Sequence, residues 1–279
     1  MRTYRVEFAG AAVELRHETE AAAAYLDFLF TDLRGSGETE TEPAAVLDIA
    51  PHGHLHLLRE AEKPLFCGGL GVQFAAILFD RVIFHLLNSQ RHGVALHAGA
   101  VSWQGKTVLL PGQSGSGKSS VTAWLCANGA AYLSDELIFL PDDGSGEVIA
   151  FPRPLCLKAG SAAAVRTLLP PDRQADILFE EGGGAVIPHR LLNPDFHLRR
   201  DPPGLLLFPR YQADAPLTAE KLPGARASSL LMGCDVNARN LPDHGFRQLT
   251  QLARTIPAWQ ISYSSFAGFA ETLARLLLP

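Results

Sequence analysis

The residues best suited to chemistry form a glycine-rich segment near the middle of the chain. Its sequence, GQSGSGKS over positions 112–119, fits the pattern G-x-x-x-x-G-K-[ST] at every fixed position. Glycines let the backbone turn so that successive N–H groups face phosphate oxygens, and a following helix adds the partial positive charge of its N-terminus. Lys118 suits the β- and γ-phosphates of a nucleotide, and Ser119 suits Mg²⁺. The predicted nucleotide-binding residues are Gly112, Gln113, Ser114, Gly115, Ser116, Gly117, Lys118, Ser119 and Ser120.

Three side chains with acid–base chemistry flank this loop in the sequence. His97 ends the apolar run VALH before the loop, and Asp135 and Glu136 follow Lys118 by 17 and 18 residues. In a βαβ-type unit, a strand returning beside the strand that precedes the loop would bring both carboxylates near the terminal phosphate. One would take a proton from an attacking hydroxyl, and the other would bind Mg²⁺. A packed histidine at a strand end and a solvated acidic turn are the alternatives.

The segments around the loop predict the elements that position it. Residues 107–111 form a short apolar run typical of a buried strand, and residues 94–103 also read as a strand. A helix is predicted from Lys118 to Asn128, because Val121 and Trp124 share one face and Gly129 stands where a helix-ending glycine is expected. The loop is therefore expected between a strand and a helix.

Length and composition favour two domains. The chain has 279 residues, of which 47% are hydrophobic and 19% charged, so it can build a sizeable core. Short strands and two helices before residue 90 predict a small N-terminal α+β domain over 1–90. The nearly all-apolar helix of this domain is expected at about 72–88. Residues 91–279 are expected to form the α/β domain that carries the loop.

Net charge and cysteine usage argue against several classes of protein. The net charge is −5 and the pI about 6.1, which does not favour a nucleic acid or an anionic membrane surface as partner. The four scattered cysteines form no CxxC pair and predict free thiols. No signal peptide is visible at the N-terminus, so a cytoplasmic protein is expected.

The segment HAGAVSWQGKTVLLPGQSGSGKSSVTAWLCANGAAYLSDE, residues 97–136, resembles the core of the HPr kinase/phosphorylase family. The likeness is greatest to its shorter HPr-kinase-related members, and a weaker likeness extends over most of residues 91–279. It implies a P-loop kinase core of the HPr-kinase and phosphoenolpyruvate-carboxykinase type. It further implies ATP- and Mg²⁺-dependent phosphorylation of a serine in a protein or peptide.

The same resemblance assigns roles to individual residues. Asp135 would be the catalytic base, Glu136 would assist the metal, and His97 would neighbour the transferred phosphate. Arg153 and Arg210, in the segments FPRP and FPRY, would stabilise charge on the transferred group. Surface arginines that follow strands are the alternative interpretation of these two positions.

The chain also departs from the family pattern. Glu136 stands where the family has a second aspartate, and residues 223–226 only faintly echo the Pro-Gly-Arg-Asn signature of the bifunctional enzymes. The reverse dephosphorylation is therefore not implied. A small-molecule kinase or carboxykinase-like enzyme with the same site is one alternative, and a nucleotide-sensing module without catalysis is another. The acceptor, the choice between ATP and GTP, and whether the chain forms a homo-oligomer are left open.

Overall fold

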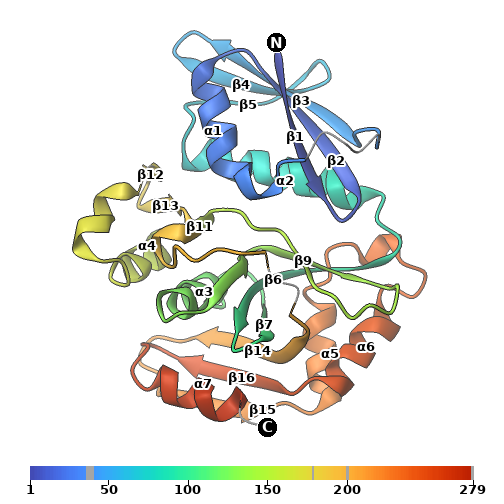
Figure 1. The fold of residues 1–279 in the computed structure, drawn as a ribbon, viewed down its shortest axis with the longest axis vertical. Helices are drawn as coiled ribbons and strands as arrows, with labels where there is room; N and C mark the ends of the chain where they lie inside the picture. The colour runs from blue at the N-terminus through green and yellow to red at the C-terminus, as the bar shows by residue number, and fades with distance from the viewer. Residues whose placement is uncertain (36–40, 178, 199–200, 278–279) are drawn as a thin grey trace. The chain divides into compact units, whose positions relative to one another are not determined.

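The computed structural model describes residues 1–35, 41–177, 179–198 and 201–277 of the chain, which divides into two units. The first unit comprises Met1–Gln90, Pro152–Ala163 and Pro171–Pro188, and the second comprises Arg91–Phe151, Ala164–Pro170 and His189–Pro279. Both mix helices with strands, so the α/β class expected from the sequence holds at this level (Figure 1). None of the helices in the described part of the chain is long and apolar enough to cross a membrane.

The first unit is built on a five-stranded sheet with the strands in sequence order. Its strands are β1 (Arg2–Phe8), β2 (Ala11–His17), β3 (Ala45–His52), β4 (Leu55–Glu60) and β5 (Lys63–Gly68). Only β2 and β3 run parallel, because the helix α1 (Glu20–Phe30) and the turn η1 (Thr31–Leu33) lie between them in the chain. The helix α2 (Val72–Asn88) matches the predicted 72–88 helix and buries Phe74, Leu78 and Val82.

A small three-stranded sheet from later in the chain belongs to this first unit. It contains β11 (Leu155–Leu157), β12 (Phe179–Glu181) and β13 (Gly184–Ile187) and is accompanied by the first five residues of α4 (Ala159–Arg166) and by the 3₁₀ helix η2 (Pro171–Asp176). These residues were expected in the 91–279 domain. They join the first unit because the Phe179 ring packs edge-on against Tyr25, with centroids 5.2 Å apart. Glu181 also accepts a 3.0 Å hydrogen bond from the Gln73 N–H, at the start of a helix whose N-cap residue, Gly71, has no side chain to cap it.

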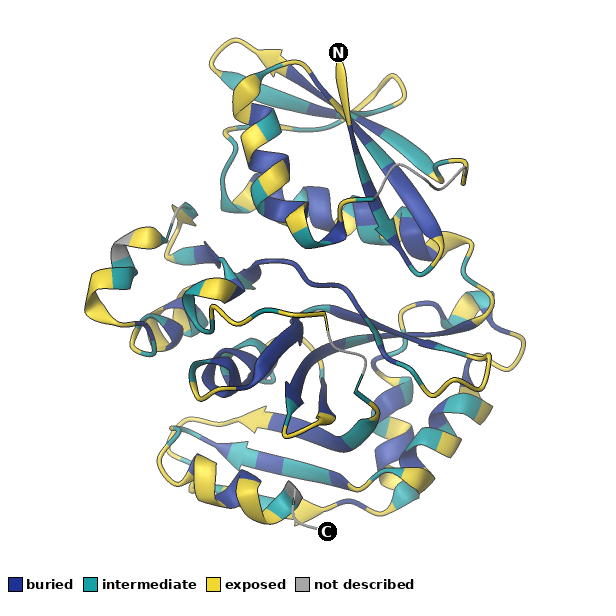
Figure 2. Ribbon diagram, in the orientation of Figure 1, coloured by how far each residue is buried: buried dark blue, intermediate teal, exposed yellow. Residues whose placement is uncertain are grey.

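The second unit is built on a mixed eight-stranded sheet with the order β10-β9-β6-β7-β14-β16-β15 and with β8 paired to β6. The strands are β6 (Gly93–Trp103), β7 (Lys106–Pro111), β8 (Ala131–Ser134), β9 (Leu137–Pro141), β10 (Ile149–Ala150), β14 (Pro203–Tyr211), β15 (Thr218–Lys221) and β16 (Ala258–Tyr263). β7, β14 and β16 run parallel to one another. Their apolar residues are largely buried, as Figure 2 shows.

Helices cover both faces of this sheet. They are α3 (Lys118–Ala127), α5 (Gly224–Met232), α6 (Phe246–Thr255) and α7 (Phe269–Leu277). Two short 3₁₀ helices, η3 (His189–Leu191) and η4 (Ala238–Asn240), complete the unit. Leu96 of β6 shares a core with Leu231 of α5 and Leu249 of α6. Gly99 of β6 instead faces α3, because a Cβ at Gly99 would lie 2.5 Å from Thr122 Oγ1. Since side chains alternate along a strand, the two β6 contacts lie on opposite faces.

The strand that follows α3 does not return beside β7. Instead, β8 pairs antiparallel with β6, with Ala100 opposite Ser134. The expected βαβ arrangement is therefore wrong in this detail. The physical reason is that β7 already has β6 on one side and β14 on the other, so both of its hydrogen-bonding edges are taken. The turn that carries Asp135 and Glu136 is reached across β6.

A distant segment continues the sheet where β7 ends. β7 stops pairing with β6 at Ala98, and beyond that point residues 234–237 lie beside β6. The His97 N–H donates to the Cys234 carbonyl at 2.8 Å. The Asn237 side chain accepts from the Ala95 N–H at 2.7 Å and donates to the Gly93 carbonyl at 3.0 Å. The main-chain groups of β6 are thereby paired while the chain after β7 leaves the sheet.

Candidate functional site

The glycine-rich loop connects the end of β7 to the start of α3, as the sequence predicted. Gly117 lies at the N-cap of α3 with φ of 97°, in the left-handed region that glycine adopts without strain. Gln113, Ser114 and Gly115 are exposed. Ser119 and Ser120 are half-buried in the first turn of α3, which points its N-terminus at the loop. This is the local geometry that an anion-binding loop requires.

Two glycines of the loop are required by close neighbours. A Cβ at Gly112 would lie 2.6 Å from Ser116 Oγ, so the turn closes tightly across the loop. A Cβ at Gly117 would lie 2.2 Å from Tyr263 Oη. Tyr263 comes from β16 and donates a 3.0 Å hydrogen bond to the Gly117 carbonyl. The loop is therefore held from one side by a tyrosine hydroxyl that only a glycine can approach.

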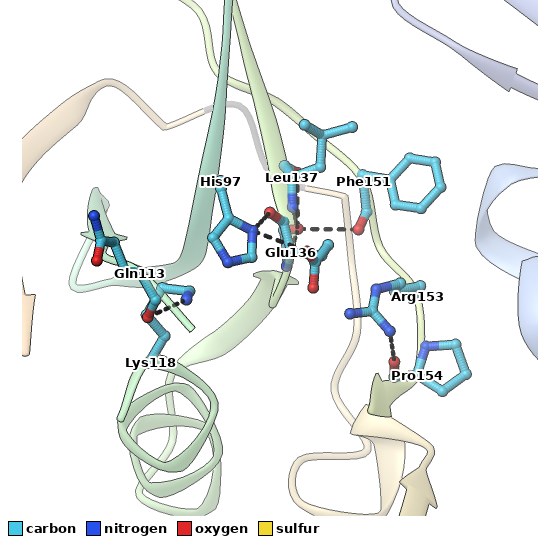
Figure 3. Close-up of polar contacts among 9 residues, drawn as sticks. His97, Gln113, Lys118, Glu136, Leu137, Phe151, Arg153 and Pro154 are labelled. Carbon is cyan, nitrogen blue, oxygen red and sulfur yellow. Dashed lines mark hydrogen bonds and ion pairs between the residues drawn. The ribbon is translucent and has the colours of Figure 1, made fainter. Parts of the chain in front are cut away.

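Lys118 bends back over the loop that precedes it. The residue is 6% exposed, and Nζ donates to the Gln113 carbonyl at 3.2 Å (Figure 3). The Cys234 thiol lies close to the same region. Burial raises the pKa of the Cys234 thiol, while the Lys118 ammonium and a hydrogen bond from the Gly112 N–H act in the opposite direction. The ammonium is thus held at the loop, within electrostatic reach of the segment that continues the sheet.

His97 lies on the same sheet face as α3. It is two residues from Gly99, whose face contacts Thr122 of α3, and alternate residues of a strand share a face. Its ring points at Glu136: Nδ1 lies 2.8 Å from Glu136 Oε1 and 3.2 Å from the Glu136 carbonyl oxygen (Figure 3). Glu136 therefore orients the imidazole through Nδ1 and leaves Nε2 on the other side of the ring.

The turn that presents the acidic pair is shaped by Ser134, which the sequence analysis did not single out. Ser134 is fully buried, and its Oγ lies 2.8 Å from the Leu137 carbonyl and 3.0 Å from the Phe151 carbonyl. The same oxygen accepts hydrogen bonds from the N–H groups of Glu136 and Leu137. A serine directly before two carboxylates was the available signal, because serine hydroxyls commonly close such turns.

Asp135 occupies the same turn but is far more buried than Glu136. It is 2% exposed, whereas the Glu136 side chain is 33% exposed. Burial first, and then the negative charge of Asp135, raise the pKa of the Cys126 thiol. Cys126 lies one helical turn beyond Thr122 on α3, so the Asp135 charge is close to the face of α3 that packs on the sheet.

The two predicted arginines occupy different surroundings. Arg210 is exposed on β14, and it alternates with Phe208 and Leu206, which pack into the core with α5 and α6. Arg210 therefore lies on the sheet face opposite to the one that carries α3 and His97. Arg153 belongs to the first unit, where it is 4% exposed and its guanidinium lies 4.7 Å from the centre of the Phe79 ring. Its Nη1 also donates to the Pro154 carbonyl at 3.4 Å (Figure 3).

A second tyrosine adjoins the loop and was also missed. The Tyr211 N–H, at the end of β14, donates to the Ser116 carbonyl at 2.9 Å. Its ring stands edge-on to Tyr263, with centroids 5.7 Å apart and planes at 71°, and the residue is 52% exposed. The segment FPRY drew attention through its arginine, yet its tyrosine is the residue whose backbone binds the loop.

The oxygen donors near the loop suit a hard cation. The Ser119 hydroxyl and the Glu136 carboxylate are the predicted Mg²⁺ ligands, and Mg²⁺ commonly takes one or two protein oxygens together with phosphate oxygens and water. Among the described residues no group of three or more His, Cys, Asp or Glu side chains forms a metal site. One oxygen of the Glu136 carboxylate already contacts His97.

No protein-family model matches this chain, and a search of curated proteins gives no match either.

Proposed function

We propose that the protein is a Mg²⁺-dependent phosphotransferase that moves the γ-phosphate of ATP to a hydroxyl, with a serine of a protein or peptide as acceptor. The observation that carries the proposal is the shared face of the second unit's sheet. Lys118 and the loop lie at one end of α3, and His97, paired with Glu136 of the turn between β8 and β9, lies on β6, the strand beside β7. Phosphate-binding and proton-handling groups on adjoining strands are what phosphoryl transfer needs.

The proposed roles follow from the chemistry of each group. Backbone N–H groups of residues 112–119 and the Lys118 ammonium hold the phosphates, since a phosphate offers Lys118 a charged acceptor in place of the Gln113 carbonyl. Mg²⁺, held by Ser119 and Glu136 with the phosphates, would neutralise charge on the transferred group. The imidazole of His97, fixed through Nδ1, presents Nε2 to the transferred phosphate.

Asp135 is proposed as the base. Its carboxylate takes the proton of the acceptor hydroxyl as the hydroxyl oxygen forms a bond to the γ-phosphorus. The bond from that phosphorus to the oxygen bridging it to the β-phosphate breaks, and ADP leaves. The products are a phosphoester and ADP, and the proton remains on the carboxylate until solvent or a neighbour removes it.

The test is phosphate transfer from γ-labelled ATP to candidate acceptors, measured with wild type and Asp135→Asn. Asparagine keeps the size of the side chain and removes the base, so transfer should fall by about 100-fold or more while ATP affinity stays unchanged. Glu220→Gln, on the exposed part of β15, is the matched control for loss of one carboxylate. Equal transfer by Asp135→Asn and wild type would rule out the base.

A nucleotide-sensing module without phosphate transfer is the second candidate, and the burial of Asp135 favours it. A carboxylate that is 2% exposed needs a local opening before an acceptor hydroxyl reaches it. This candidate predicts ATP binding with no phosphorylated product for any acceptor in the panel. Free serine and short organic acids belong in the same panel, because product from these alone would identify a small-molecule kinase or carboxykinase-like enzyme.

A further inference from the structure

The surroundings of the phosphate loop differ in chemistry between its two sides. On the β6 side stand His97 and Glu136, which are polar and titratable. On the β14 side stands the Tyr211 ring, at the end of a strand whose residues 205–209 are all buried. Tyr211 itself is 52% exposed, and it is one of few large hydrophobic side chains in the described chain that are so exposed. An exposed aromatic ring beside a phosphate loop needs an explanation.

The register of β14 places this ring on the loop side of the sheet. Tyr211 lies four residues after Leu207, on the same face of β14, and three residues after Phe208, which faces the α5 and α6 core on the other side of the strand. Its Cβ would lie 3.3 Å from a Cβ at Gly117, so the side chain starts directly beside the loop. Tyr211 therefore lies on the sheet face that α3 covers. His97 lies on the same face, on the opposite side of the loop.

Tyr211 is also firmly held. Its N–H donates to the Ser116 carbonyl at 2.9 Å, and the next residue, Gln212, donates from its N–H to the Tyr263 carbonyl at 2.9 Å. The buried Tyr263 ring supports the Tyr211 ring from the side. A fixed aromatic ring with only two side-chain torsions loses little conformational entropy when a ligand covers it.

We propose that Tyr211 is a stacking surface for the base of the nucleotide whose phosphates occupy the loop. This inference rests on the proposed function, because it needs a nucleotide in the loop. Three parallel strands, β7, β14 and β16, end at this edge, and ligands of α/β sheets bind at the carboxyl ends of parallel strands. With the acid–base groups on the β6 side, the base of a bound nucleotide extends along the β14 side.

Stacking also sets the expected specificity. Every nucleobase has an aromatic face, so a tyrosine platform favours purines over the smaller pyrimidines and does not separate adenine from guanine. ATP and GTP should therefore bind with similar affinities, within about threefold of each other, and CTP should bind more weakly.

The test is calorimetric titration of the full chain, in Mg²⁺ buffer, with ATP, GTP and inorganic tripolyphosphate. Tyr211→Ala should lower the affinities for ATP and GTP by about 10- to 100-fold, the range expected for loss of one base–aromatic stack. The affinity for tripolyphosphate should stay unchanged. Tyr211→Phe should restore nucleotide binding, because the ring is retained. Both variants keep the backbone N–H that binds Ser116. Phe246→Ala removes an equally exposed ring from α6 as the control.

The outcomes separate this inference from the proposed function. The stacking role alone would be overturned if the wild type binds tripolyphosphate but Tyr211→Ala loses no more ATP affinity than Phe246→Ala does. Equal weakening of all three ligands by Tyr211→Ala would also overturn it, since the residue would then act through the shape of the loop. If the wild type binds none of the three ligands, the nucleotide site itself would be overturned.

Discussion

The two sides of the glycine-rich loop, residues 112–119, are supported in different ways. On the β6 side, the polar groups are held by a buried hydroxyl: Ser134 closes the turn that presents Glu136, and Glu136 orients His97. On the β14 side, the support is aromatic: Tyr263 binds the Gly117 carbonyl and supports the ring of Tyr211. The loop is therefore shaped by hydrogen bonds on one side and by packed rings on the other.

This difference predicts separable consequences. Replacing His97 on the β6 side should alter phosphate transfer while the fold and the nucleotide affinity persist, because its side chain is partly exposed and is not assigned to the nucleotide or the metal. Changes on the β14 side should alter stability and nucleotide affinity together, because Tyr263 is buried in a cluster with Phe266 and Phe269. Transfer and binding can then be assigned to opposite flanks of one loop.

Among the substitutions that test this difference, the largest expected effect comes from His97. His97→Ala should lower phosphate transfer by about 100-fold, since it removes the ring proposed to face the transferred group, and should leave ATP affinity within about twofold. Glu136→Ala should lower transfer by about 10- to 100-fold, because the Glu136 main-chain carbonyl still lies near Nδ1 of His97 while the proposed Mg²⁺ ligand is lost. Transfer rates and calorimetric affinities measure both. A matching loss of ATP affinity would contradict the division between the two sides.

A smaller effect is expected on the aromatic side. Gly117→Ala should destabilise the fold by about 2 kcal/mol and lower the affinity for ATP, because its Cβ would lie 2.2 Å from Tyr263 Oη and its φ is 97°. Tyr263→Phe alone should cost about 1 kcal/mol through the lost hydrogen bond. Together the two changes should cost less than their sum, because the phenylalanine removes the nearest clashing atom. Denaturant unfolding of the four proteins measures this coupling, and strict additivity would show that the hydroxyl is not the obstacle.

The smallest effect concerns Asp235, a carboxylate beside β6 that has no part in the proposed transfer. Burial raises the pKa of Asp235 to about 6. The folded chain therefore binds the proton more tightly than the unfolded chain, so stability falls as the pH rises from about 4 to 6 and stays lower above that range. Asp235→Asn should be more stable than wild type by about 1 kcal/mol at pH 8, after screening, with the gain vanishing below about pH 4. Thermal unfolding at the two pH values decides this, and a gain independent of pH would exclude the titration.

The elements nearest the loop were the most predictable from sequence. The helix after the loop ends as expected, with Gly129 at φ of 97° just past it, because glycine is the residue that best adopts the conformation that stops a helix. The buried strands β6 and β7 were recognisable as apolar runs. These features depend on residues close together in the chain, which is why local patterns revealed them.

The features that were missed depend on distant partners. The sequence around the acidic turn could not predict that β8 pairs with β6. This pairing arises because β14, nearly 100 residues later in the chain, occupies the second edge of β7. The assignment of β12 to the first unit depends on Phe179 meeting Tyr25. Tyr263 belongs to no motif, Tyr211 stands in FPRY only as the neighbour of the arginine, and the ends of two paired parallel strands bring both tyrosines to the loop.

The segment beside the N-terminal half of β6 has a consequence for how the protein is made. Asn237 is 142 positions from Ala95 and 144 from Gly93, the two residues that its side chain joins. A ribosome therefore releases the glycine-rich loop long before the groups that complete the sheet next to it. Until the last part of the chain emerges, the open edge of β6 is available to other strands, and a chaperone that shields it would raise the yield of folded chain.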